Sequence, residues 1–389
     1  MQYIKEKKYI LFWIINLLLI FNVFKIYELG ISNDKIRLLC YGFLAINFPI
    51  CVLRMLIKQN FKININGFSA YIGIYMILVA IRLILGGELQ WDIWLNCFLV
   101  PGVIIECCID LKDINIYKVL KYEEIIAYIL IFFFIYNKIF LHQAGAGKLN
   151  SVFYVLLLMP IILCINNNIR RNILIVLIAI SSVISLKRTS LIIFTLCYAI
   201  FMISEKRTSV KKMLKILISI IVLVVIIYWI QGKLGIDMIS KMKNMAEDGG
   251  SGRSDIYSIL IRELFNRPFN EILFGGGTSA VVNIIGGTAH NDFLEVVYDF
   301  GILGFLIYLG IYDFLIRKYI KMKKVNYKFK TQFLISIICF FIMSMLSHVI
   351  MIPTYILHFA IFWGIILDDF LKFKLNIRKY YFQLKKRIT

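Results

Sequence analysis

The residues with the clearest chemical potential are basic side chains that stand inside or between apolar runs. Lys187 and Arg188 interrupt the run SVISLKRTSLIIF, and Arg82 lies in MILVAIRLILGGE. Ionisable groups in a membrane segment are costly and suggest a functional site by default, and guanidinium groups bind phosphate oxygens through paired hydrogen bonds. The simpler alternatives are snorkelling of Arg82 to the membrane interface and an ordinary hairpin turn at Arg188.

A second set of candidates lies in residues 232–291, the longest connection between apolar runs. The stretch SGRSDIYSILIRELFNRP has apolar residues at helical spacing and predicts an amphipathic helix, which Ser254 caps and Pro268 ends. Arg253 precedes that helix, and the three glycines of LFGGGTSA suit either a backbone approach to a phosphate or a flexible turn. His290 stands before a further helix start, where the helix dipole favours a neutral imidazole that accepts a proton.

Other titratable residues near these motifs have less specific patterns. Asp292 and Glu295 resemble a capping box, and we prefer capping to a catalytic role for them. His348 and His358 flank a predicted outer turn and either line the same cavity or lie at the interface. We expect no metal site and no cofactor, because the outer side has no acidic cluster and the eight cysteines lack CxxC or Cys/His spacing.

The elements that must position these residues are apolar segments distributed along the whole chain. Of 389 residues 60% are hydrophobic, against roughly 45–50% in soluble domains, and a membrane span needs roughly 20 apolar residues. We therefore predict an all-α, polytopic integral membrane protein with about 12 transmembrane helices. The predicted spans are 9–24, 36–57, 68–85, 91–109, 123–141, 151–165, 171–186, 189–204, 213–231, 292–315, 331–352 and 354–372.

The distribution of basic residues predicts the orientation of these spans. The 44 Lys and Arg residues exceed the 23 Asp and Glu residues, and cytoplasmic loops concentrate Lys and Arg. Both termini are accordingly predicted inside, which leaves the basic pair and the long loop outside. The net charge of +21 then reflects topology and not binding of nucleic acid. The predicted divisions are spans one to nine in 1–231, a large external loop in 232–291, spans ten to twelve in 292–372, and a basic cytoplasmic tail in 373–389.

Three motifs on the predicted outer side resemble those of the O-antigen ligase/polymerase superfamily, the Wzy and WaaL type of bacterial membrane glycosyltransferase. They are SLKRTS, then SGRSDIY with a later PFNEILFGGG, then AHNDFLEVVYDFGILG, which together cover about 181–310. The His-Asn segment is the most specific of them. The chain departs from the family pattern at Lys187, beside the first arginine, and at Tyr257, where the family often has tryptophan.

The resemblance implies a GT-C-like glycosyltransferase at the outer face of the bacterial inner membrane. Arg188 and Arg253 would bind the pyrophosphate of an undecaprenyl-linked donor glycan, and His290 would activate the acceptor hydroxyl for an inverting, metal-independent attack. We expect further contacts with pyrophosphate or glycan from Arg82, Lys187, Tyr257, Gly276, Asn291 and His348. The expected partners are lipid-linked donor and acceptor and membrane lipids, and a Wzz-type chain-length regulator is an additional candidate.

These motifs leave more than one activity open. We prefer a polymerase of O-antigen or capsular polysaccharide repeat units, and the alternative within the family is a ligase that transfers glycan to lipid A-core or protein. Outside the family, a flippase or transporter would show paired halves and ionisable groups near mid-membrane. The chain shows no visible halves, and its charged candidates lie at the outer end, which favours an enzyme over a transporter or a structural scaffold.

Overall fold

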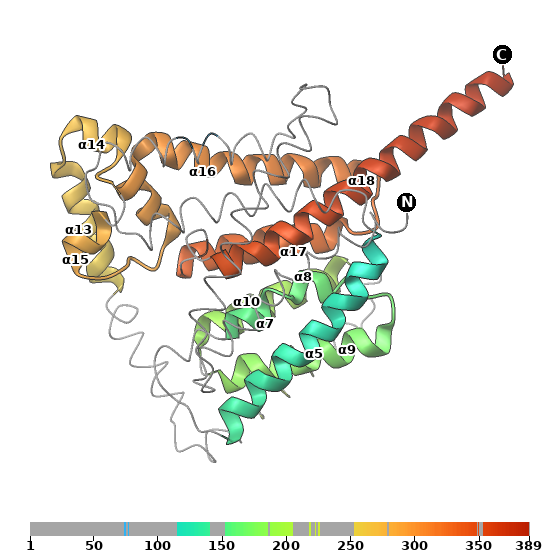
Figure 1. Ribbon diagram of the computed structural model, residues 1–389, viewed down its shortest axis with the longest axis horizontal. Coiled ribbons are helices and arrows are strands. Elements are labelled where there is room, and N and C mark those ends of the chain that lie inside the picture. The colour runs from blue at the N-terminus through green and yellow to red at the C-terminus, as the bar shows by residue number, and fades with distance from the viewer. Residues whose placement is uncertain are drawn as a thin grey trace, which may run out of the picture.

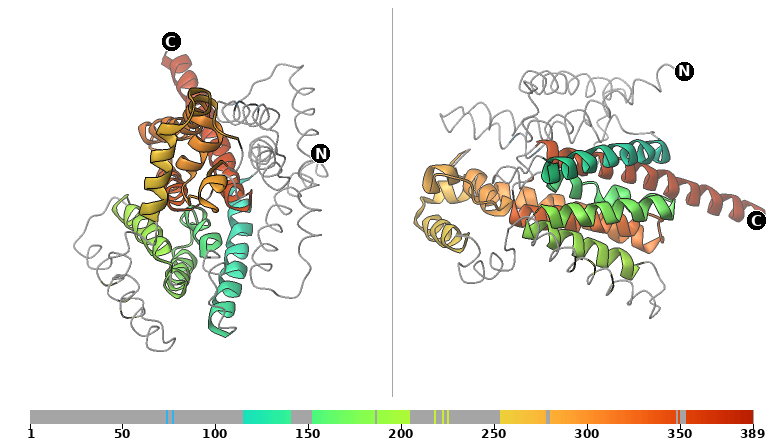
Figure 2. Two further views of the ribbon diagram at one scale, coloured as in Figure 1. Left: turned by 90° about the vertical axis from the view of Figure 1, so that its left-hand side faces the viewer. Right: turned by 90° about the horizontal axis from the view of Figure 1, so that it is seen from below.

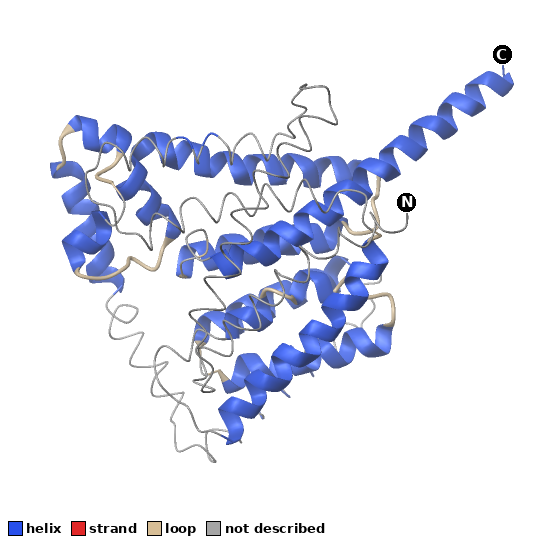
Figure 3. Cartoon of the chain, viewed as in Figure 1, coloured by secondary structure: helices blue, strands red, loops and turns tan. Residues whose placement is uncertain are grey.

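The computed structural model describes residues 115–140, 152–185, 187–204, 253–277, 280–347, 349 and 353–388, and the isolated helical residues Ile74, Ile77, Ile218, Val222 and Val225. Within these ranges every regular element is an α-helix (Figure 3). The predicted spans 9–24, 36–57, 68–85, 91–109 and 213–231 fall wholly or almost wholly outside them. The all-α class is therefore confirmed for the described residues, and the number of spans stays a prediction.

The first group of described helices contains α5 (Ile116–Phe140), α7 (Val152–Leu156), α8 (Met159–Ile162), α9 (Asn168–Ile184) and α10 (Arg188–Ser204). Figure 2 shows this group, coloured from cyan to light green, packed together beside the red C-terminal helix. The predicted span 151–165 is two short helices, because Pro160 has no amide hydrogen to bond the carbonyl four residues earlier, at the end of α7. Both short helices are buried.

The second group consists of α16 (Asp292–Lys324), α17 (Lys330–Leu346) and α18 (Pro353–Ile388). Aromatic side chains form its core: the Phe340 ring lies 5.2 Å from Trp363 and 5.2 Å from Tyr312, measured between centroids. The buried indole of Trp363 donates to Ser336 Oγ at 2.9 Å, so no polar atom of this side chain is left unsatisfied. α18 does not end at 372 but continues as one helix through the predicted tail, and it projects from the bundle in Figure 1.

α16 folds back on itself near its start. Gly301 has φ 68° and ψ −171°, which interrupts the helix. Sixteen residues of straight helix would separate Asp292 and Tyr308 by about 24 Å, yet Tyr308 Oη donates to Asp292 Oδ2 at 3.3 Å. The first nine residues of the predicted span 292–315 therefore lie alongside the remainder and do not lengthen it.

α16 as a whole is the one described helix that meets the length and hydropathy requirements of a span, and 152–162, 189–204 and 330–346 are apolar but shorter. The apolar part that follows the kink, residues 302–316, extends about 22 Å as a helix. It continues into the basic stretch RKYIKMKK at 317–324.

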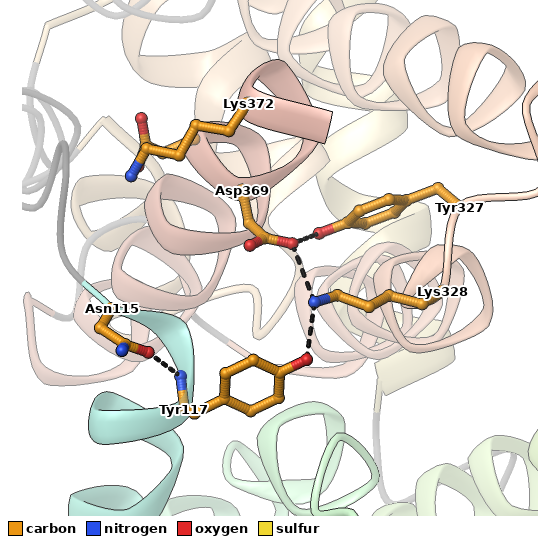
Figure 4. Close-up of polar contacts among 7 residues, drawn as sticks. Asn115, Tyr117, Tyr327, Lys328, Asp369 and Lys372 are labelled. Atoms are coloured by element: carbon orange, nitrogen blue, oxygen red, sulfur yellow. Dashed lines mark hydrogen bonds and ion pairs between the residues drawn. The ribbon is translucent and has the colours of Figure 1, made fainter. Parts of the chain in front are cut away.

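A polar cluster joins the first group of helices to the second at the end predicted to be cytoplasmic (Figure 4). Lys328 Nζ, from the turn between α16 and α17, donates to Tyr117 Oη at 3.0 Å and lies 3.3 Å from Asp369 Oδ2. Tyr327 Oη donates to the same carboxylate oxygen at 2.6 Å. Burial lowers the pKa of Lys328, but the contacts with Tyr117 and Asp369 outweigh it and raise that pKa.

Candidate active site

A serine cluster holds the turn between α9 and α10, where the basic pair of the sequence lies. Ser182, Ser185 and Ser190 are fully buried. The hydroxyls of Ser185 and Ser190 lie 2.9 Å apart, and both donate to the backbone carbonyl of Ser182, at 2.7 and 3.1 Å. Side-chain hydrogen bonds from both helices therefore hold the turn. They fix the backbone that carries Lys187 and Arg188.

Lys187 occupies this turn in a partly apolar environment. Its backbone N–H donates to Ser185 Oγ at 3.2 Å, and its ammonium nitrogen lies 4.0 Å from the centroid of the buried Phe153 ring, a cation–π contact. Burial, and then the positive charge of Arg253, lower the pKa of Lys187 to about 8. Arg188 is the first residue of α10, and its side chain lies outside the described residues.

Arg253 begins α13 (Arg253–Asn266), the amphipathic helix predicted in the long loop. The helix buries Leu260 against Ala280, Val281, Ala289 and Tyr298, and it leaves Phe265 exposed. The prediction that Ser254 caps this helix is wrong, because Arg253 is already helical. The helix ends at Asn266, two residues before Pro268, as predicted. Tyr257 lies one turn into the helix and is partly buried.

His290 lies in a turn whose backbone is held from both sides. It has φ 52°, a left-handed conformation that is uncommon for residues other than glycine. The backbone N–H of Ala289 donates to the Glu295 carboxylate. Asn291 caps α16, because its Oδ1 accepts from the backbone N–H groups of Phe293 and Leu294 at 3.0 and 3.3 Å. His290 as a whole residue is exposed to solvent, and its imidazole is nevertheless partly desolvated by the protein around it.

The predicted capping box is therefore wrong in its residues. Asn291, expected to contact substrate, is the cap, and its side-chain oxygen is committed to the helix. Glu295 does reach back, but to the amide before His290. Asp292 accepts instead from the backbone N–H of Val349, 57 residues away, at 3.0 and 3.2 Å.

Three basic groups converge at this site from separate segments. Burial, then the charges of Arg253 and Lys187, lower the pKa of His290, and Arg253 also acts on Lys187. The turn between α9 and α10, the start of α13 and the turn before α16 thus lie within electrostatic range of one another. A lowered pKa keeps the imidazole neutral at pH 7, so it is able to accept a proton.

The triple-glycine motif has a structural role. α14 (Phe269–Phe274) ends at this motif, and the amides of Gly275, Gly276 and Gly277 donate to the carbonyls of Glu271, Tyr298 and Asp299, respectively. The last two carbonyls lack helical partners because α16 is interrupted at Gly301. The amides are therefore not available to a phosphate, and the contact of Gly276 with pyrophosphate or glycan stays a prediction.

Arg267 stabilises this glycine turn through contacts with the protein itself. Its guanidinium lies 4.3 Å from the centroid of the Tyr298 ring. It also donates to the Tyr298 carbonyl at 3.2 Å and lies 3.8 Å from the Glu271 carboxylate. Arg267 thus fastens the loop to α16.

The remaining candidates do not join the site as described. Arg82 and His348 lie outside the described residues, so their predicted contacts stay predictions. His358 is fully buried within α18, and its position relative to the membrane stays a prediction. Among the described residues no three His, Cys, Asp or Glu side chains group to hold a metal. Sequence reasoning missed Phe153, whose only signal was its place at the start of an apolar run.

Comparison with known proteins supports the resemblance of these motifs. No curated protein matches the chain. A family model described as O-antigen ligase matches residues 173–309, a range that contains Lys187, Arg253 and His290. The match supports the resemblance of residues 173–309 to the O-antigen ligase/polymerase superfamily, whose members are membrane glycosyltransferase-like enzymes.

Proposed function

We propose that this protein polymerises oligosaccharide repeat units linked to undecaprenyl pyrophosphate, at the outer face of the bacterial cytoplasmic membrane. The convergence of Lys187, Arg253 and His290 from three separate segments carries this proposal. Two fixed cations beside a neutral imidazole suit a reaction in which a phosphorylated group leaves and a hydroxyl is deprotonated.

In the proposed reaction the acceptor hydroxyl oxygen attacks the anomeric carbon of the donor sugar. The bond from that carbon to the pyrophosphate oxygen breaks, and the configuration at the carbon inverts. His290 takes the hydroxyl proton, while Lys187, Arg253 and Arg188 stabilise the negative charge that develops on the pyrophosphate. Pyrophosphate is a good leaving group under these conditions, so the reaction needs no metal.

The charges of the site make donor binding and base strength interdependent. Without substrate, burial and then the charges of Arg253 and Lys187 lower the pKa of His290 and favour its neutral form. A bound pyrophosphate offsets their charge, which raises the affinity of the imidazole for a proton. His290 therefore becomes a stronger base when the donor is bound. It then takes its proton from the acceptor hydroxyl, and without donor it has less tendency to take one from water.

A ligase that transfers finished glycan to lipid A-core or protein is the second candidate function. The description of the matching family model, O-antigen ligase, is the observation that favours it. Both reactions use the same donor chemistry and differ in the acceptor, so the acceptor must be identified by experiment.

The decisive experiment is a glycan gel from a strain that lacks this gene, complemented with the wild-type protein or with Arg253→Ala or His290→Ala. Single repeat units on the final acceptor, without a ladder, indicate a polymerase. Full-length glycan retained on undecaprenyl pyrophosphate indicates a ligase. Arg262→Ala, an exposed arginine on the same helix α13, is the control and should restore the wild-type pattern. A normal ladder from both site variants would refute the proposed site.

A further inference from the structure

Asp292 is a fully buried carboxylate beside the candidate base, and local structure does not explain it. It is the first residue of α16, a position at which Asn291 already provides the cap. A buried carboxylate is costly unless hydrogen bonds compensate its desolvation. The helix dipole favours an acid in the first turn, but full burial also requires hydrogen-bond donors, and those of Asp292 come from distant segments.

Those contacts reach three other parts of the fold. Both carboxylate oxygens of Asp292 accept from the backbone N–H of Val349, at 3.0 and 3.2 Å, in the segment that joins α17 to α18. Tyr308 Oη, from the second part of α16, donates to Oδ2 at 3.3 Å. The same hydroxyl lies 3.0 Å from Ser344 Oγ of α17 and 3.3 Å from Tyr312 Oη.

The position of Asp292 makes this network relevant to the candidate base. His290 precedes Asp292 by two residues, and it has a left-handed backbone conformation that the surroundings must maintain. Glu295 accepts from the amide of Ala289 in this turn, and Asn291 accepts from the amide of Phe293 in the first turn of α16. Asp292 holds the His290 turn to the second part of α16, through Tyr308, and to the α17–α18 connection, through Val349.

We propose that Asp292 is a positioning residue for His290, because its carboxylate fixes the His290 turn against the α17–α18 connection and the second part of α16. The imidazole then stays within range of Arg253 and Lys187. The catalytic part of this inference rests on the proposed function, whereas the positional part is a property of the fold.

The positional part is tested without activity, in a protein whose eight native cysteines are replaced, by attaching a nitroxide to a single cysteine at the exposed position 290 (His290→Cys). We expect an immobilised spectrum in this background and a mobile one when Asp292→Ala is added. A label at the exposed Arg317 (Arg317→Cys), at the other end of α16, should give the same spectrum in both backgrounds. An immobilised label at 290 in the Asp292→Ala protein would overturn the proposal, as would mobility gained equally at both labels.

The catalytic part is tested by a double-mutant cycle on glycan transfer by the purified protein. A displacement of about 1 Å at a reacting group can cost about 100-fold in rate, so Asp292→Ala should lower kcat by about 10- to 100-fold. If Asp292 acts through His290, the double variant should be no slower than His290→Ala alone.

Three further results have defined meanings. Additive losses in the cycle would overturn the positioning role. Asp292→Asn, which keeps an oxygen acceptor for the Val349 amide, should recover most of the activity that Asp292→Ala loses. Full activity of His290→Ala would refute the proposed base and the catalytic role of Asp292, while the label measurement still decides the positional part.

Discussion

The pH dependence of glycan transfer should reveal Lys187 as a titrating part of the phosphate-binding site. Burial and Arg253 lower its pKa to about 8, so the ammonium group loses its proton as the pH rises through that value. The donor site then loses one cation. We expect kcat/KM, which reports the free enzyme, to fall about tenfold per pH unit above pH 8.

On the acidic side of the pH profile, activity is lost because His290 gains a proton. The pKa of His290 is lowered from its ordinary value of 6.5, so the imidazole stays neutral down to below that pH. Activity should fall only as the pH drops through this lowered pKa, because a protonated imidazole does not accept the hydroxyl proton. The expected profile is bell-shaped, with its basic side set by Lys187.

The effect of the Lys187 pKa shift on stability distinguishes this mechanism from unfolding at high pH. The difference between the ordinary pKa of 10.5 and a value near 8 corresponds to about 3 kcal/mol. Between these two pH values the unfolded chain binds a proton that the folded site releases, so this group adds stability as the pH rises. Lys187 therefore contributes a loss of activity and a gain of stability over the same pH range.

The assay is transfer between lipid-linked oligosaccharides by purified protein from pH 5 to 10, with thermal unfolding measured in parallel. Lys187→Arg should remove the basic decline, because a guanidinium stays protonated over this range. Lys187→Met should remove it too and should lower the rate at pH 7 by about 10- to 100-fold, the value of a hydrogen bond to a charged group. A basic decline near pH 8 that persists in Lys187→Arg would refute this reasoning.

Three further predictions concern the scaffold. Gly301→Ala should abolish accumulation of folded protein in membrane fractions, because the added Cβ would lie 2.4 Å from a backbone carbonyl oxygen at a residue with φ 68°, whereas Gly287→Ala, with nothing within 4 Å, should accumulate normally. Lys328→Met and Asp369→Asn should each lower the melting temperature in detergent, and the pair should be non-additive by about 1 kcal/mol; full additivity would contradict a direct ion pair. His358→Phe should leave the melting temperature unchanged or raise it, because no hydrogen bond within the described residues satisfies either ring nitrogen; a large decrease would indicate a partner.

Local patterns in the sequence were sufficient for the elements of the site. Apolar runs and helical spacing predicted helices at 189–204, 331–352 and in SGRSDIYSILIRELFNRP, and the structure has α10, α17 and α13 there. A helix is formed by residues three and four positions apart, so the spacing of apolar residues along the sequence is enough to predict it. The motifs also indicated Arg253 and His290 as candidates, because the Gly-Arg in the long loop and the His-Asn before a helix start resemble the superfamily motifs.

The tertiary structure decided what those residues do. Whether three glycines receive a phosphate or satisfy the carbonyls of an interrupted helix depends on Gly301, about 25 residues away in the chain. Likewise Asp292 looks like a cap in the sequence, but its partner is the amide of Val349. The lowered pKa of Lys187 comes first from burial by the packed helices and then from the charge of Arg253, 66 residues further along. Desolvation and hydrogen bonding are set by distance in space, so the types and local spacing of residues determined the helices and candidates, and only packing determined the partners.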